Sequence, residues 1–149
     1  MNYEYRNFSW EKYTKYENKL FENYDFTNTF FENAAFKCVT FKDCLFSKCN
    51  MSNIGLWNSN FINCKFINVD LRDMPIGAEG GLFEDCLFQR CDFRGQYFWY
   101  PFFKNCIFDK CKLKKIDFND ASFYNCKFVG KLEDVTFNGM YHKKETGLK

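Results

Sequence analysis

Large apolar residues recur at every fifth position over most of the chain. Of twenty central positions in two runs of ten repeats, sixteen are Phe, three are Leu and one is Met51. The pattern indicates a structural repeat of five residues. The runs are FTNTF, FENAA, FKCVT, FKDCL, FSKCN, MSNIG, LWNSN, FINCK, FINVD and LRDMP from Phe26, then FEDCL, FQRCD, FRGQY, FWYPF, FKNCI, FDKCK, LKKID, FNDAS, FYNCK and FVGKL from Phe83.

A period of five fits neither an α-helix nor a flat strand. Five steps along a helix turn roughly 500°, so successive Phe side chains would scatter around the cylinder. Five steps along a flat strand reverse the face each time. All central residues can point inward only if the backbone turns a corner once per repeat. Four such corners close a square coil of about twenty residues, and stacked coils form a β-solenoid.

A second inward position lies two residues before each centre, and it holds small or medium residues because a dense core leaves little room beside a Phe. The other three positions are mostly polar and are expected to face solvent. Stacking at about 4.8 Å per coil predicts that Cys44 lies over Cys64, and Cys86 over Cys106. The small residues are Ala34, Val39, Cys44, Cys49, Ile54, Ser59, Cys64, Val69, Cys86, Cys91, Cys106, Cys111, Ile116, Ala121 and Cys126.

These repeats resemble the pentapeptide-repeat family, whose motif is approximately A/C/S/T/V, D/N, L/F, x, x. The resemblance covers roughly residues 21–137. It implies an all-β fold, a right-handed quadrilateral β-helix solenoid of about five coils. At ~4.8 Å per coil the rod would be on the order of 25 Å long.

The sequence predicts three segments. Residues 1–20 are expected to cap the first coil, residues 21–137 to form the β-helix, and residues 138–149 to form a C-terminal tail. Loops near 72–82 and 129–135 are expected to interrupt the repeat. The first of them is rich in Pro and Gly, which is typical of a loop that leaves the coil.

Two forms of the cap remain open. Ser9 could cap a short helix that carries Trp10, Tyr16 and Leu20. Alternatively, an irregular first coil begins at Tyr16–Asn18. Lys19 argues against an early start, because it would occupy an inward small position.

Composition limits the environment and the partners. Twenty-one basic against nineteen acidic residues give a net charge of +2, so neither nucleic acid nor a membrane is expected as a partner. No apolar stretch is long enough to span a bilayer. The nine cysteines are odd in number and follow no evident secretory signal, so we expect reduced thiols and a cytoplasmic location.

The residues of catalytic and metal sites do not form a recognisable pattern. The single histidine, His142, lies in the expected tail, and the cysteines lack a CxxC spacing. The thiols are therefore interpreted as buried and inert. Acidic residues are scattered over outward positions without a marked pair. We therefore expect that the protein is not an enzyme and that it binds neither a cofactor nor a metal ion. The basic cluster is expected to spread over two faces: Lys110, Lys112, Lys114 and Lys115.

Exposed aromatic residues offer the better lead to function. Trp57, Trp99 and Tyr100 occupy positions that should face water, and they form the candidate surface for a partner or for self-association. If Ile76 continues the register across the first loop, Trp57 and Trp99 would approach one another. The alternative is local packing beneath the Arg72–Leu82 loop.

The predicted function is that of a non-catalytic scaffold for protein–protein interaction. The resemblance adds an alternative, an antibiotic-resistance or immunity factor that protects or inhibits DNA gyrase or topoisomerase IV. Relatives of that kind mimic the shape and negative charge of B-form DNA and dimerise through their C-terminal ends, so a homodimer is one candidate assembly. The excess of basic residues and the absence of a continuous acidic face in the sequence count against such mimicry.

Overall fold

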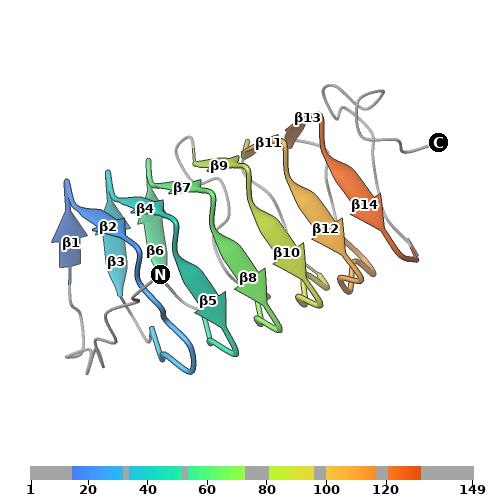
Figure 1. The fold of residues 1–149 in the computed structure, drawn as a ribbon, viewed down its shortest axis with the longest axis horizontal. Helices are drawn as coiled ribbons and strands as arrows, with labels where there is room; N and C mark the ends of the chain where they lie inside the picture. The colour runs from blue at the N-terminus through green and yellow to red at the C-terminus, as the bar shows by residue number, and fades with distance from the viewer. Residues whose placement is uncertain are drawn as a thin grey trace.

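A computed structural model describes residues 15–31, 34–51, 54–72, 81–95, 100–116 and 121–131. These residues contain short strands and no helix, so none of them form a helix that could cross a membrane. The strands wind into successive coils from β1 at one end to β14 at the other (Figure 1). They are β1 Lys15–Glu17, β2 Leu20–Glu22, β3 Ala35–Lys37, β4 Thr40–Lys42, β5 Leu45–Ser47, β6 Gly55–Trp57, β7 Asn60–Ile62, β8 Lys65–Ile67, β9 Leu82–Glu84, β10 Leu87–Gln89, β11 Phe102–Lys104, β12 Ile107–Asp109, β13 Ser122–Tyr124 and β14 Lys127–Val129.

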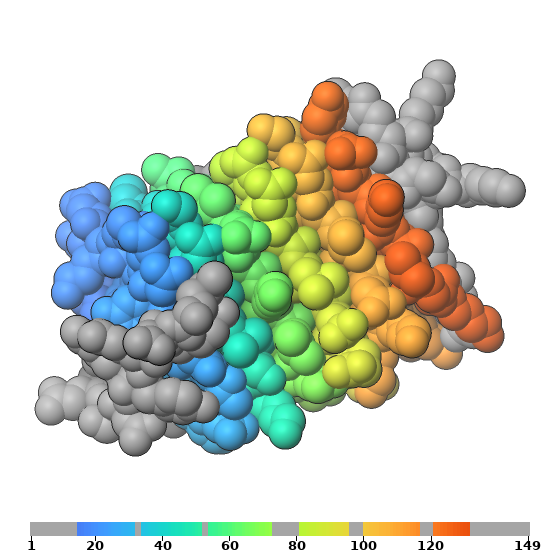
Figure 2. Space-filling view, viewed as in Figure 1, coloured from blue at the N-terminus to red at the C-terminus, as the bar shows by residue number. Residues whose placement is uncertain are grey.

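The coil has four faces, as predicted. Face 1 is the parallel sheet β1-β3-β6, face 2 is β2-β4-β7-β9-β11-β13, and face 3 is β5-β8-β10-β12-β14. Face 4 is a row of parallel bridges from Phe30 through Asn50, Asp70 and Asp92 to Lys112. The six strands of face 2 mark five complete turns, and Figure 2 shows these turns as bands along the long axis. The predicted all-β solenoid of about five coils is confirmed.

Stacked aromatic rings fill the core. The described central Phe residues from Phe26 to Phe123 are at most 1% exposed. Along face 2 the rings of Phe61 and Phe83 stack with centroids 4.9 Å apart. Within a coil, neighbouring faces meet edge to face, as Phe41 and Phe46 do at 5.5 Å and 72°. All fifteen predicted small residues are buried as well.

Two extra residues enter the coil at the first interruption. Elsewhere strand partners lie twenty positions apart, but Ile62 pairs with Glu84 and Asp70 with Asp92, twenty-two apart. Residues 73–80, including Ile76, lie outside the described part of the chain. The longer turn places Cys86 over Cys64, so the predicted cysteine columns join into one column of five: Cys44, Cys64, Cys86, Cys106 and Cys126.

The corners depend on a third position that the sequence analysis treated only as polar. The residue two places after each described centre has φ between 48° and 60° where it is not Gly. Asn and Asp tolerate this left-handed conformation better than most residues, and they hold ten of these sixteen positions. The backbone N–H at the corner then donates to the next coil, as Asn23 does to the Lys42 carbonyl at 3.1 Å.

The small inward position is also a hydrogen-bonding position. The Cys44 thiol lies 3.3 Å from the carbonyl oxygens of both Phe21 and Lys42. The Ser59 hydroxyl makes the equivalent contacts with the carbonyl oxygens of Phe36, at 3.3 Å, and Trp57, at 3.2 Å. Cysteine therefore combines a small volume with a weak donor for buried carbonyls. Eight cysteines are buried in this way, and Cys38, at a corner, is exposed. Burial raises the pKa of the Cys49 thiol to about 11.

The first described coil begins earlier than residue 21. Lys15–Glu17 pairs with β3, and the ring of Tyr16 stacks on Phe36 at 5.7 Å. A helix through Tyr16 and Leu20 is therefore wrong, because both residues belong to strands whose backbone pairs with the next coil. Lys19 does not block the coil; it is exposed, with its ammonium 5.3 Å from the centre of the Tyr16 ring.

Several predicted features lie outside the described residues. They include Ser9 and Trp10 of the cap, most of the 129–135 loop, the end of the predicted β-helix at residue 137, and the tail. Val129 ends β14, and Gly130 follows it with φ 121°.

Candidate functional site

Trp57 lies on the outer surface of face 1, in strand β6, and is 40% exposed. A Cβ added at Gly55 would overlap the six-membered ring of Trp57, so the indole lies over Gly55 of its own strand. The absence of a side chain at Gly55 therefore makes room for the ring of Trp57. The sequence prediction that Trp57 faces outward is confirmed.

A hollow of about 320 Å³ adjoins the indole on face 1. The small residue Ala35 lies on the middle strand β3, between Lys15 on β1 and Gly55 on β6. Charged side chains from the same strands border the hollow, so it offers an apolar centre with a polar rim. The lining residues are Lys15, Tyr16, Glu17, Ala35, Lys37 and Trp57.

Tyr100 is a second exposed aromatic residue, 69% exposed and at a left-handed corner with φ 51°. The pairing of Asn60 with Leu82, and of Leu82 with Phe102, carries the register from Asn58 to Tyr100 in two coils. At ~4.8 Å per coil, Tyr100 lies roughly 10 Å from the neighbourhood of Trp57. Trp99 lies outside the described residues, so its approach to Trp57 remains a prediction.

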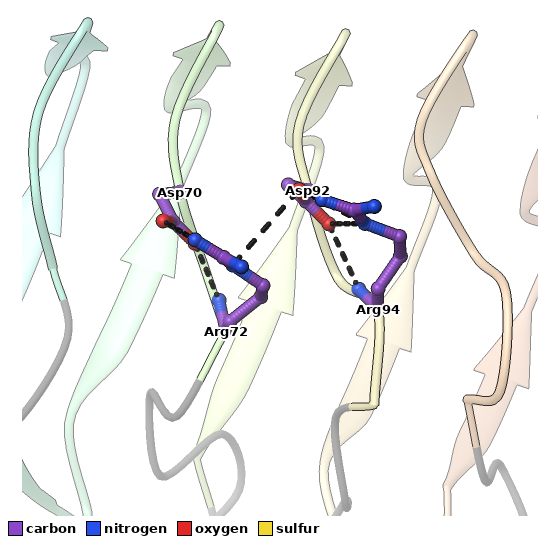
Figure 3. A network of polar contacts seen from close by, with 4 residues as sticks. All are labelled: Asp70, Arg72, Asp92 and Arg94. Atoms are coloured by element: carbon purple, nitrogen blue, oxygen red, sulfur yellow. Dashed lines mark hydrogen bonds and ion pairs between the residues drawn. The ribbon is translucent and has the colours of Figure 1, made fainter.

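Face 4 carries a network of charged side chains (Figure 3). Nε and Nη2 of Arg72 lie 2.9 and 2.7 Å from the two carboxylate oxygens of Asp70. Arg94 holds Asp92 with the same two distances. Arg72 also lies 3.9 Å from Asp92, which links the two coils.

The arginines hold the pKa values of both carboxyl groups below their ordinary value. For Asp70 the main cause is the hydrogen bond from Arg72. Partial burial would raise the pKa of Asp92, but the hydrogen bonds and charge of Arg94 outweigh it. The side chains of Arg72 and Asp70 are 49% and 39% exposed, so this pair contributes little stability, whereas the Asp92 side chain is only 16% exposed.

The next coil replaces this arrangement with lysines. Lys112 stands where Asp70 and Asp92 stand in their coils, and Lys114 stands where the arginines do. A hollow of about 400 Å³ is lined by Arg72, Arg94, Gly95, Lys114 and Lys115. A second hollow, of about 310 Å³, also includes Lys112 and Lys131.

The sequence analysis missed this grouping. It expected the lysines to spread over two faces, and Lys110 does follow β12 at the edge of face 3. The structure, however, brings Lys112 and Lys114 together with Arg72 and Arg94. The available signal was the recurrence of Asp-x-Arg at 70–72 and 92–94, twenty-two residues apart.

Acidic residues on face 2 alternate with bases. Glu22 pairs with Lys42 and Glu84 with Lys104, each at 2.7 Å. At the corner beside face 2, the side-chain amide of Asn105 donates to Asp85 at 3.0 Å. Across the coils that the structure describes, the carboxylates therefore do not merge into one acidic surface.

Reactive groups do not converge in the described coils. No three His, Cys, Asp or Glu residues there are placed to hold a metal ion. All nine cysteines are free, and eight are inside the coil. His142 lies outside the described residues.

Comparison with known proteins agrees with this geometry. A family model described as pentapeptide repeats matches residues 86–125 in eight copies, and one described as the SV2A/B/C luminal domain matches residues 4–79. The chain belongs to the pentapeptide-repeat proteins, and its first half to the SV2A/B/C luminal-domain family. In this pentapeptide-repeat protein the motif accounts for the inward residues. No curated protein matches the chain.

The solved structures that match the chain are similar to it only distantly. QnrB1, a plasmid-mediated fluoroquinolone resistance protein, is 16% identical over 86% of this chain and 82% of its own, with a TM-score of 0.41. A protein from the cyanobacterium Cyanothece is 10% identical over 91% of both chains, with a TM-score of 0.34. HetL, from a Nostoc strain and involved in heterocyst differentiation regulation, is 14% identical over 93% of this chain and 88% of its own, with a TM-score of 0.28. Similarity at this level assigns no function.

Proposed function

We propose that this chain is a non-catalytic scaffold that binds a protein partner through face 1, with Trp57 as the central contact. The observation that carries the proposal is the exposed indole lying over Gly55 at the edge of a hollow. Trp is among the residues most enriched at the energetic centres of protein interfaces. Among the described residues, no three His, Cys, Asp or Glu side chains are placed to hold a metal ion.

The geometry around Trp57 favours binding in a physical sense. The indole rests on its own strand, so little side-chain freedom remains to be lost when a partner covers it. An apolar side chain of the partner would enter the hollow against Trp57 and Ala35, while Lys15, Glu17 and Lys37 would form a charged rim. Tyr100 would provide a second contact two coils away, and Trp99 remains a proposed member of the same surface.

We also propose that the protein works in a reducing compartment, with the cytoplasm as the expected location. The buried cysteines support this proposal, because Cys44 and its equivalents donate through S–H groups that a disulfide would lack.

The proposal is tested by capture from a lysate of the native host. Trp57→Ser removes the indole, and Tyr124→Ser, which removes a 44% exposed aromatic residue from face 2, is the matched control. We expect a partner that wild type and Tyr124→Ser retain and Trp57→Ser loses, with unchanged melting temperatures. Sedimentation of the same variants tests whether the partner is a second copy. Equal capture by all three proteins would refute the role of face 1.

A supercoiling assay distinguishes action on a type II topoisomerase from the proposed scaffold function. The pairing of Glu22, Glu84, Asp70 and Asp92 with bases gives the described faces little resemblance to a polyanion. We therefore expect gyrase supercoiling, with and without quinolone, to be unchanged at micromolar protein. A change in supercoiling or in drug inhibition would instead support the topoisomerase alternative.

A further inference from the structure

Face 4 has a charge pattern that changes along the rod. In two successive coils a central residue of face 4 is flanked by Asp and Arg, as Asp70 and Arg72 flank Leu71. We call the two residues that flank such a centre a rung, and the Asp and Arg of each of these two rungs cancel in charge. In the third coil Lys112 and Lys114 flank Leu113, and the structure gives neither a carboxylate partner among the described residues. The third rung therefore carries two positive charges where the others carry none.

Positive charge accumulates around this rung. Two adjoining hollows, about 400 and 310 Å³, share Arg94 and Lys114. Among the residues that the structure describes, six basic side chains line these hollows, and Asp70 and Asp92 are carboxylates that pair with two of the six. The six are Arg72, Arg94, Lys112, Lys114, Lys115 and Lys131.

We propose that this basic end of face 4 binds an acidic segment of a protein partner, through side-chain carboxylates that enter the hollows beside Lys112 and Lys114. Face 4 already shows how it holds carboxylates: Nε and Nη2 of each arginine contact the two oxygens of an aspartate. A carboxylate beside Lys114 would continue the row of acid–base pairs by one rung. The site is separate from Trp57, which lies on face 1.

A peptide fits these observations better than nucleic acid does. The charged row spans three rungs, on the order of 10 Å, whereas tight binding to duplex DNA commonly uses about six to ten phosphate contacts. Arg72 and Arg94 in the same row already hold Asp70 and Asp92, so fewer cations remain for a continuous phosphate backbone. A short acidic segment needs only the cations at the end of the row.

The proposal is tested by fluorescence anisotropy with the full chain. The probes are a labelled peptide of alternating Asp and Glu, its Asn and Gln counterpart, and a short DNA duplex. Lys112→Asp gives the third rung the acid found in the other two. Lys65→Asp makes the same charge change one residue before a centre on face 3. Trp57→Ser should leave binding of the acidic peptide unchanged, which separates this site from the proposed function of face 1.

The expected result is binding of the acidic peptide that weakens as salt rises. Lys112→Asp should raise Kd by about tenfold, because it replaces attraction by repulsion within the site. Lys65→Asp should change Kd less than about twofold, because Lys65 lies on face 3, away from the hollows. If Lys112→Asp lowers the melting temperature, Lys114→Gln provides the same comparison. Equal affinity of wild type and Lys112→Asp, equal binding of the neutral peptide, or tighter binding of DNA would each overturn the proposal.

Discussion

The left-handed corner at Asn105 provides a quantitative test of the coil geometry. Its φ is 53°, its side-chain amide donates to Asp85 at 3.0 Å, and its amide oxygen accepts from Asn125 at 2.9 Å. Asn105→Val places a β-branched residue in a conformation that costs ordinary L-residues about 1–2 kcal/mol. The two exposed hydrogen bonds add about 1 kcal/mol together, at the low end for such bonds.

The expected loss is therefore about 2–3 kcal/mol of unfolding free energy, a large part of a typical stability of about 5–15 kcal/mol. For a chain of this size, that corresponds to a fall in melting temperature of roughly 4–12 °C. Asn105→Gly loses the same hydrogen bonds but avoids the steric cost, so it should lose only about 1 kcal/mol. Lys127→Val, at an exposed strand position, should be nearly neutral.

Urea unfolding followed by circular dichroism measures all three variants, with the slope m checked for constancy. The reasoning would be refuted if Asn105→Val were as stable as Asn105→Gly. That result would mean that the backbone at this corner does not require a residue tolerant of positive φ.

Two further predictions concern titratable groups. In the native protein a thiol reagent should label only Cys38 rapidly, because the other cysteines are buried and burial raises the pKa of thiols such as Cys49. In denaturant the reagent should label all nine cysteines. Rapid labelling of most thiols in the native protein would contradict the buried column. The free energy of unfolding should decline in acid, because the pKa values of Asp70 and Asp92 are depressed in the folded protein. The contribution of these carboxylates to stability is complete above their unfolded pKa of about 4, and it is lost as the pH falls through the folded pKa values. Asp70→Asn should flatten this acid decline by less than about 1 kcal/mol in pH-dependent urea titrations, and an unaltered decline would show that the pair with Arg72 does not form.

The inside of this molecule could be predicted almost residue by residue. Side-chain volume decides which residues fit beside a stacked Phe, and volume can be read directly from the sequence. That is why Ala34, Cys44 and Ile116 were all assigned correctly to the interior. The same argument could not show that the Cys44 thiol also serves buried carbonyls, because hydrogen bonding depends on where the neighbouring coil places its backbone.

The corners and the surface were harder to predict. Asn at 63 and 105 was interpreted only as polar, although its value lies in tolerating positive φ. The grouping of Lys114 with Arg72 depends on how many extra residues the interruption adds to the coil, and the five-residue period does not contain that number. The neighbours of a surface residue in a solenoid lie one coil away, so they cannot be assigned from the sequence when the register between coils is unknown.

Photo-cross-linking beside Trp57 tests the central claim most directly. The photoreactive residue p-benzoylphenylalanine would replace Lys37, which borders the hollow on face 1, in one variant and Tyr124 in a control, both in the native host under ultraviolet light. The account predicts a discrete adduct with a protein partner from position 37 and none from position 124. No adduct from position 37, or the same adduct from both positions, would contradict face 1 as the partner-binding surface.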